Sequence, residues 1–411
     1  MRRRCTYIES GAALTDPDRL AKCAEVSVTF AYMKLVRASS RRATASAVLA
    51  VTAIMAAGCA RFDDSASTPF SPEPSFGAAE IDPVDPDAPP TSTSAAPGPP
   101  PGPCVDPDPN VIATCLDTTG GLVMLPGGAS ALIGERRTGR IVQVAQGQQP
   151  TEVARVDVDA SGDGGLLDLA LSPSYAEDGL IYAYITTGSD NRVVRIAAGD
   201  TPKPVLTGIP RGQVSNRGAI EFSSPSQMLV LTGDAGNPAA ATDPASLSGK
   251  LLRVDSLTPS ANPPAPAVAL SGIGTAGDVC TDQTGSIWVT DRTAVEDRLQ
   301  RIDQLGTVVS PVWTWPDRPG VAGCAAGPGT VAIALTTGKA VAVLATDENT
   351  GAVTAAPSLV AQDRYGQLNG AAISGDGTIW AGTVNKNGDA PGPNDDRVVK
   401  IPVPAGGGGF D

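Results

Sequence analysis

The chain has 411 residues, 41% of them hydrophobic, and is long enough to bury a substantial core. It contains no histidine, which excludes a His-dependent catalytic triad, an imidazole general base and a His-ligated metal site. The formal net charge is -13, and the body of the chain contains no cluster of basic residues. Nucleic acid and anionic lipid headgroups are therefore poor candidate partners. The 46 glycines and 37 prolines, with short Val-, Ile- and Thr-rich runs, favour strands and turns over helices.

An export signal occupies residues 33–58, which begin with basic residues and continue with an apolar stretch from Ala43 to Ala57. Gly58 and Cys59 follow directly, and small residues before a cysteine are typical of a bacterial lipoprotein signal peptide. A transmembrane helix is the alternative, but the apolar stretch is shorter than the roughly 20 residues that span a bilayer. We predict that Cys59 is modified with a lipid such as palmitate. The lipid would anchor the exported protein to the outer face of the cell membrane, in the cell envelope.

Residues 1–32 precede the signal and show neither an apolar core nor a repeat. Either they are an extension before a true start at Met33, or they form a long N-terminal region of the signal peptide. The segment from Pro69 to Pro109 holds 14 of the 37 prolines, and nearly all of it lies within residues 59–108. Such a composition predicts a disordered, extended linker between the lipid anchor and the folded domain.

Four cysteines follow Cys59, and an even number in an exported protein predicts two disulfides. The local pair is Cys104–Cys115, which leaves Cys280–Cys324 as the long-range pair.

The body of the chain, residues 109–405, contains six repeats with a period near 50 residues. Each repeat has an apolar strand, and the six are found at 129–136, 179–186, 227–234, 285–291, 330–336 and 377–383. A second strand follows each of them, opened by a turn residue and then a base: Arg140, Arg192, Lys250, Arg298, Lys339 and Arg397. This pattern predicts an all-β domain, a six-bladed β-propeller, with a Gly-rich tail at 406–411. We interpret the recurrent bases as charges at hairpin edges that prevent sheets from associating.

Two acidic segments could bind a metal or a ligand. The run from Asp157 to Asp168 (DVDASGDGGLLD) resembles a calcium-binding EF-hand loop, but it lacks the final Glu and is flanked by predicted strands, which favours an ordinary turn. The segment 233–237 (GDAGN) follows a strand without the features of a phosphate-binding loop. Asp234 is therefore expected at the mouth of the propeller channel, where propellers bind ligands.

Several segments resemble the soluble glucose/sorbosone dehydrogenase family: 134–141 (GERRTGRI), 162–186, 232–255 and 374–380 (SGDGTIW). With the signal peptide and 312–326 (VWTWPDRPGVAGCAA), the chain also resembles a mycobacterial lipoprotein. The family resemblance implies a six-bladed propeller that uses pyrroloquinoline quinone (PQQ) and calcium to oxidise sugars.

The chain departs from the family at the positions that the resemblance assigns to the active site. The family's catalytic His lies in a His-Asn-Gly-Gly segment that corresponds here to Ser215-Asn216-Arg217-Gly218. The family's quinone-contacting Arg-Asn pair falls on Gly274 and Thr275, a further His on Arg292, and an Arg near Asn369. A serine without a neighbouring base has too high a pKa to accept a proton from a sugar hydroxyl at neutral pH.

Three hypotheses follow. The first is an anchored propeller that has lost the chemistry and binds a carbohydrate or an envelope protein. The second is an active PQQ-dependent oxidoreductase in which a carboxylate, Asp234, Glu221 or Asp278, replaces the histidine as the base. The third is an envelope scaffold whose channel is plugged by side chains. The fold alone does not distinguish them.

Overall fold

The computed structural model describes residues 104–260, 263–388 and 391–403, all of which belong to the compact unit Ser94–Asp411. The predicted signal peptide, Cys59, nearly all of the linker and the Gly-rich tail lie outside the described residues. No helix among the residues described is both long and apolar enough to cross a bilayer.

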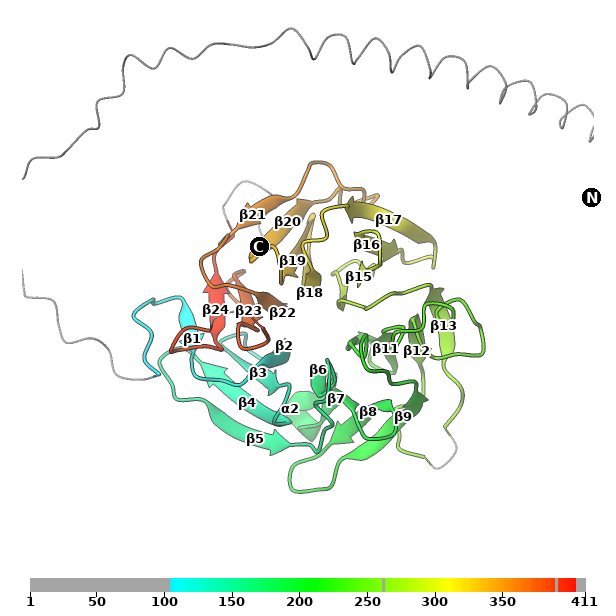
Figure 1. The fold of residues 1–411 in the computed structure, drawn as a ribbon, viewed down its shortest axis with the longest axis horizontal. Helices are drawn as coiled ribbons and strands as arrows, with labels where there is room; N and C mark the ends of the chain where they lie inside the picture. The colour runs from blue at the N-terminus through cyan, green and yellow to red at the C-terminus, as the bar shows by residue number, and fades with distance from the viewer. Residues whose placement is uncertain (1–103, 261–262, 389–390, 404–411) are drawn as a thin grey trace, which may run out of the picture. The chain divides into compact units, whose positions relative to one another are not determined.

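Within the described residues the chain forms six four-stranded antiparallel sheets, numbered here as blades 1 to 6 (Figure 1). Blade 1 consists of β2 (Thr119–Met124), β3 (Ser130–Glu135), β4 (Arg140–Ala145) and β5 (Thr151–Arg155). Blade 2 consists of β6 (Leu166–Leu171), β7 (Ile181–Thr186), β8 (Asn191–Ile196) and β9 (Lys203–Ile209). Blade 3 consists of β10 (Gly218–Ser224), β11 (Gln227–Thr232), β12 (Lys250–Val254) and β13 (Ala267–Ser271). One short helix, α2 (Tyr175–Asp178), connects β6 to β7.

Blades 4 and 5 consist of β14 (Val279–Thr281), β15 (Ile287–Arg292), β16 (Asp297–Ile302) and β17 (Val308–Trp315), and of β18 (Val321–Gly327), β19 (Thr330–Leu335), β20 (Ala340–Ala345) and β21 (Ser358–Val360). Blade 6 combines β22 (Leu368–Ile373), β23 (Ile379–Thr383) and β24 (Val398–Ile401) with β1 (Val111–Ala113), the first strand of the chain. Pairing of β1 with β24 closes the ring, because the outer strand of the last blade comes from the start of the domain.

The first strands of the blades (β2, β6, β10, β14, β18 and β22) contact one another in a closed circle around the central channel. The predicted six-bladed propeller is confirmed. Each predicted strand pair is also found, as the second and third strands of one blade. In blade 1, for example, Leu132 on β3 lies opposite Gln143 on β4.

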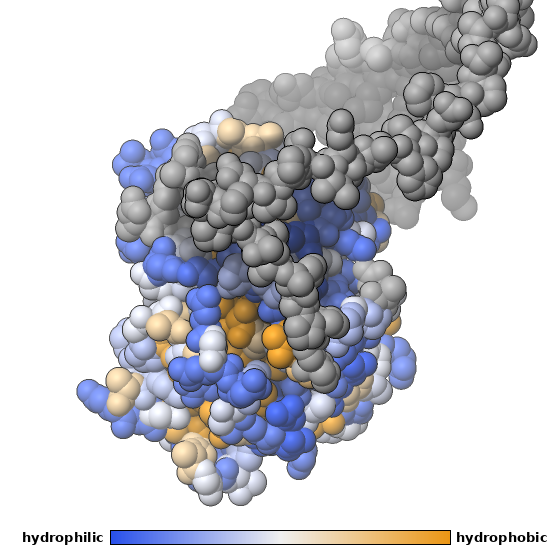
Figure 2. All heavy atoms as spheres, turned by 90° about the vertical axis from the view of Figure 1, so that its left-hand side faces the viewer, coloured by the Kyte–Doolittle hydropathy of each residue, from blue (hydrophilic) through white to orange (hydrophobic). Residues whose placement is uncertain are grey.

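The hydrophobic core lies between neighbouring blades, because each sheet buries both faces. Leu132 and Ile141 of blade 1 pack with Leu166 and Ile185 of blade 2, and all four are at least 95% buried. Similar clusters join the other blades. Burial of each such side chain contributes about 1.5–3 kcal/mol relative to leaving it in water. The outer face seen in Figure 2 is largely hydrophilic, with hydrophobic residues grouped near its centre.

The bases that open the third strands do not have the predicted role. The strands β4, β8, β12, β16, β20 and β24 are interior strands of their sheets, so their bases are not edge charges. Four of the bases instead form ion pairs with an acid that lies in the preceding strand or in the loop after it: Glu135–Arg140, Asp190–Arg192, Asp291–Arg298 and Asp395–Arg397. Lys250 is fully buried and donates to the carbonyl oxygens of Ala240, Ala241 and Ser248 at 2.7–3.0 Å. These interactions tie the loops at one end of blades 1, 2, 3, 4 and 6 to their sheets.

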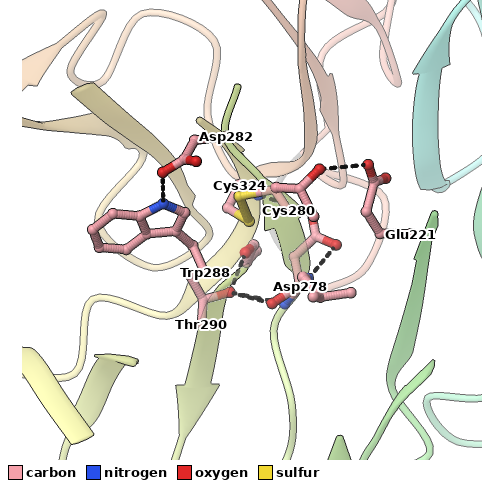
Figure 3. The surroundings of a disulfide bond; sticks show 10 residues. Glu221, Asp278, Cys280, Asp282, Trp288, Thr290 and Cys324 are labelled. Carbon is pink, nitrogen blue, oxygen red and sulfur yellow. Dashed lines mark hydrogen bonds between the residues drawn. A yellow bond between two sulfur atoms is a disulfide. The ribbon is translucent and has the colours of Figure 1, made fainter. Parts of the chain in front are cut away.

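Both predicted disulfides are present. Cys104–Cys115 closes a short loop beside β1, with Cα atoms 5.4 Å apart. Cys280–Cys324 joins β14 to β18, the inner strands of blades 4 and 5, with Cα atoms 5.9 Å apart (Figure 3).

Candidate functional site at the channel mouth

The candidate site lies at the end of the channel where the inner strands begin and the second strands end. In blade 3, for instance, Gly218 at the start of β10 pairs with Thr232 at the end of β11. Loops at this end carry Ser215 and Asp234, and Arg292 ends β15 here, so the fold gathers these sequence-predicted positions although they are distant in sequence.

Arg217 reaches across this mouth. It precedes β10 of blade 3, and its Nη2 donates a hydrogen bond to the side-chain Oδ1 of Asn369 on β22 of blade 6, the opposite blade of the ring. Asn369 is 7% exposed and its Nδ2 donates to the carbonyl oxygens of Thr119 and Gly120 in blade 1. Burial lowers the pKa of the Arg217 guanidinium.

Two further arginines border the same space. Arg136, after β3, donates to the carbonyl of Gly164 at 2.6 Å and to Asn387 Oδ1 at 3.1 Å. Arg292, at the end of β15, donates from Nε to the carbonyl of Val321 at 2.6 Å. Burial, followed by repulsion from Arg217, lowers the pKa of Arg292 to about 9. The mouth therefore concentrates three positive charges.

These arginines line a cavity of about 150 Å³ together with Thr118, Thr119, Asp168, Asp278, Asn369 and backbone at several glycines. Pockets for drug-sized ligands have volumes of about 300–1,000 Å³. The cavity is thus suited to a ligand of only a few heavy atoms.

Below the arginines, three carboxylic acids from blades 2, 3 and 4 lie inside the channel. Burial raises the pKa of Glu221 to about 7 and that of Asp278 to about 6, and for Glu221 the Asp278 charge adds to this. Burial and Asp278 also raise the pKa of Asp168 well above its usual range. Each accepts a hydrogen bond: Asp168 from the amide of Ile220 at 2.7 Å, Asp278 from two backbone amides at 2.8 Å, and Glu221 from a threonine hydroxyl at 3.2 Å.

Asp168 and Asp278 mark the waist of the channel, since they border both the mouth cavity and a second cavity of about 290 Å³ in its other half. Glu221 and the disulfide Cys280–Cys324 line only the second cavity. Figure 3 shows Glu221 and Asp278 close to the disulfide Cys280–Cys324. Side chains narrow the channel without filling it, so the structure differs from the plugged channel that a pure scaffold predicts.

Ser215 lies in a buried turn with φ 60°, and its hydroxyl forms a hydrogen bond of 3.3 Å with the hydroxyl of Thr275. The structure thus brings together two positions that the family resemblance assigns to the site. The partner is another alcohol rather than a base, so this contact does not activate Ser215 for proton transfer.

Asn216 and Gly274 serve the local structure. The buried Asn216 side chain donates to Asp163 Oδ1 at 2.8 Å and to the carbonyl of Gly212 at 2.9 Å, so it fixes the loop before β10. A Cβ at Gly274 would lie 2.2 Å from the carbonyl oxygen of Arg292, so only glycine allows this approach of blades 3 and 4.

Asp234 lies beside the mouth in a cavity of about 410 Å³ between blades 3 and 4, together with Ser215, Thr275 and Arg292. It accepts a hydrogen bond from the amide of Gly236 at 2.9 Å. The mouth cavity itself does not include Asp234. Of the three predicted carboxylates, Asp278 alone borders that cavity.

Residues 157–165 of the EF-hand-like run form a loop between β5 and β6, and residues 166–168 begin β6, so the run is flanked by strands as predicted. Asp159 pairs with Arg211 at 2.6 Å, Asp163 bonds to Asn216, and Asp168 lies in the channel. No group of three acids or cysteines arranged to hold a metal ion is found among the described residues.

The residues of the mouth do not fit the quinone that the family resemblance implies. Arg217 and its bond to Asn369 cross the space, and Ser215 replaces the family's base. Asp159 and Asp163 of the segment 157–168 bond to separate partners, which does not match an oxygen cage for calcium.

The cavity of about 620 Å³ at the opposite end lies between blades 4 and 5, and no predicted site residue lines it. Its lining includes Asp282, Arg301 and Asp347.

Sequence reasoning missed Arg217 and Arg136 as site residues. The signal for Arg217 was a large cation at a glycine of the family's motif. Arg136 follows a repeat strand, and its convergence with the other two arginines depends on the closure of the ring.

No curated protein sequence matches this chain. Residues 116–304 match the family described as glucose/sorbosone dehydrogenase.

Among solved structures, the PQQ-bound aldose sugar dehydrogenase from Streptomyces coelicolor is 28% identical, with a TM-score of 0.63, and the match covers 71% of this chain and 96% of that one. A putative oxidoreductase (glucose dehydrogenase) from Thermus thermophilus is 26% identical, with a TM-score of 0.61 and coverage of 71% and 98%. The apo-form aldose sugar dehydrogenase from Escherichia coli, 19% identical with a TM-score of 0.59 and coverage of 71% and 98%, shares the fold. The described domain is therefore a six-bladed propeller that is similar to the proteins of the glucose/sorbosone dehydrogenase family.

Proposed function

We propose that this protein is an exported lipoprotein whose propeller binds a ligand at the channel mouth and does not oxidise sugars. The observation that carries the proposal is the hydrogen bond of Arg217 to Asn369 across the mouth, where related enzymes would need open space for a cofactor. The absence of histidine from the sequence supports it, because Ser215 has only a hydroxyl partner at the position of the family's base. The partner class is a carbohydrate or an envelope protein.

Anchoring through Cys59 places this binding activity on the outer face of the cell membrane, and the proline-rich segment after it supplies a spacer. Replacement of Cys59 by Ser is expected to move the protein from the membrane fraction to the soluble fraction and to abolish palmitate incorporation, because the thioether-forming sulfur is lost. Cys5→Ser serves as the control. Membrane association of the Cys59→Ser variant equal to that of the wild type would contradict the anchor.

The proposed absence of sugar oxidation is tested with the full chain purified in detergent. We expect no sugar-dependent reduction of an artificial electron acceptor after addition of PQQ and calcium, above the rate without PQQ. The aldose sugar dehydrogenase of Streptomyces coelicolor, assayed in parallel, confirms that the assay reports turnover. PQQ-dependent oxidation of an aldose by this chain would refute the proposal.

One observation favours the alternative of an active oxidoreductase. Asp278 borders the mouth cavity, and burial raises its pKa to about 6, which suits a general base near neutral pH. If the assay shows turnover, Asp278→Asn should abolish it. Turnover that survives this substitution would exclude Asp278 as the base.

A further inference from the structure

The three arginines at the channel mouth come from three different blades and approach one small space. Arg136 belongs to blade 1, Arg217 to blade 3 and Arg292 to blade 4, and all three border the cavity of about 150 Å³. Their hydrogen-bond acceptors seen in the structure are backbone carbonyls and the side-chain amides of Asn369 and Asn387. These acceptors are neutral, and Asp163 attracts all three guanidinium groups only through space.

Two guanidinium donors at this site have no acceptor. The Nε of Arg136 and the Nη2 of Arg292 are shielded from solvent and form no hydrogen bond among the described residues. Buried polar groups are nearly always paired, so such donors indicate a missing partner. Arg136 itself is only 8% exposed, which fixes its donors at the cavity wall.

The acids that share the cavity are engaged elsewhere. Asp278 accepts the amides of Val279 and Cys324 on its two oxygens, and Asp168 accepts the amide of Ile220. Asp163, which attracts Arg136 and Arg217 through space, is held by Asn216. None of these carboxylates forms an ion pair with the three arginines in the described part of the chain.

The complementary ligand is negatively charged and compact, and it accepts hydrogen bonds from several directions. A guanidinium group matches carboxylate and phosphate oxygens through two parallel N–H donors. A cation would be repelled, and a neutral ligand would leave the guanidinium groups without a hydrogen-bonded anion. The volume of the cavity limits the group that enters it to a few heavy atoms, whether that group is a free anion or part of a carbohydrate or a protein.

We propose that the channel mouth is a binding site for a small oxyanion, a carboxylate or a phosphate group, held by Arg136, Arg217 and Arg292. The inference deepens the proposed function, on which it rests, by naming the ligand class. Arg217 and Arg292 stand where the family has a glycine and a histidine, so the site is a property of this chain.

The test is isothermal titration calorimetry of the full chain in detergent at constant ionic strength, with inorganic phosphate in one arm and malonate in the other. We expect saturable binding of at least one anion, and the tighter of the two identifies the class. Arg292→Gln should weaken that binding at least tenfold, because it removes a charge and the forked donors.

Arg155→Gln is the matched control, since Arg155 is an exposed residue of blade 1 that pairs with Glu152 on the outer strand. It should bind as the wild type does. Equal weakening in both variants, or no saturable binding of either anion to the wild type, would overturn the proposal. Circular dichroism and thermal unfolding establish that each variant is folded, and Arg292→Lys, which keeps the charge, should bind with intermediate affinity.

Failure of the proposed function and failure of the oxyanion site are distinguishable by experiment. PQQ-dependent sugar oxidation would refute the loss of chemistry, whereas the oxyanion site is decided by phosphate and malonate binding in the absence of quinone.

Discussion

Removal of the Cys280–Cys324 disulfide is expected to lower the free energy of unfolding by about 4 kcal/mol, the chain-entropy value for a closed loop of this length. The two cysteines are 44 residues apart in sequence and join the inner strands of blades 4 and 5. Both are buried in a cluster with Trp288 and Leu299. The bond therefore restricts the unfolded chain across a complete blade.

Urea unfolding of the Cys280→Ala/Cys324→Ala variant measures this loss. The control is Cys104→Ala/Cys115→Ala, whose bond spans only 11 residues and should cost about 3 kcal/mol by the same relation. If the double variant does not fold, unfolding of the wild type with and without reductant gives the comparison. A loss no larger for the long-range bond than for the short one would contradict the expectation.

The disulfide also supports the channel, because the amide of Cys324 donates to Asp278 at 2.8 Å. The covalent bond thus fixes a donor that orients one of the buried carboxylates (Figure 3). Two features that the sequence treats separately, a cysteine pair and an aspartate, belong to one structural unit.

The fold was predictable because the propeller repeats itself in sequence. Strands such as 179–186 and 285–291 are short apolar runs that recur with turn residues at the same offsets, and each one becomes the second strand of a blade. The inner and outer strands are less regular. The strand β14 has only three residues and β13 is largely exposed, so neither carries a strong pattern of its own.

The site was only partly predictable. A resemblance in sequence located Ser215 and Thr275, which the structure joins by a hydrogen bond. It did not locate the Arg217–Asn369 contact, whose partners are 152 residues apart and meet only when the ring closes. The misread bases show the same limit. Arg298 would stand at a sheet edge if no strand paired with the far side of β16. The strand β17 does pair there, but its sequence pattern is weak, so the interior position of Arg298 and its ion pair with Asp291 were not predicted.

Replacement of Glu221 by Gln is expected to stabilise the domain by about 3 kcal/mol above pH 7, since burial raises the pKa of this carboxyl from 4.5 to about 7. The folded state holds this proton more tightly than the unfolded state does. The carboxyl therefore imposes no penalty below pH 4.5, an increasing one between pH 4.5 and 7, and its full penalty above that range. Glutamine has nearly the same shape and still accepts the hydrogen bond from Thr281.

The free energy of unfolding, measured by urea titration from about pH 4 to about pH 8, should thus fall with rising pH less steeply in Glu221→Gln than in the wild type, and the two curves should meet near the acidic end. Glu177→Gln, which removes an exposed charge next to β7, is the matched control and should leave the slope unchanged. Because Asp278 raises the pKa of Glu221, Asp278→Asn should reduce the benefit of the Glu221 substitution in a double variant. Parallel curves for the wild type and Glu221→Gln would mean that Glu221 ionises normally. Water would then reach this carboxyl far more readily than its buried position in the channel indicates.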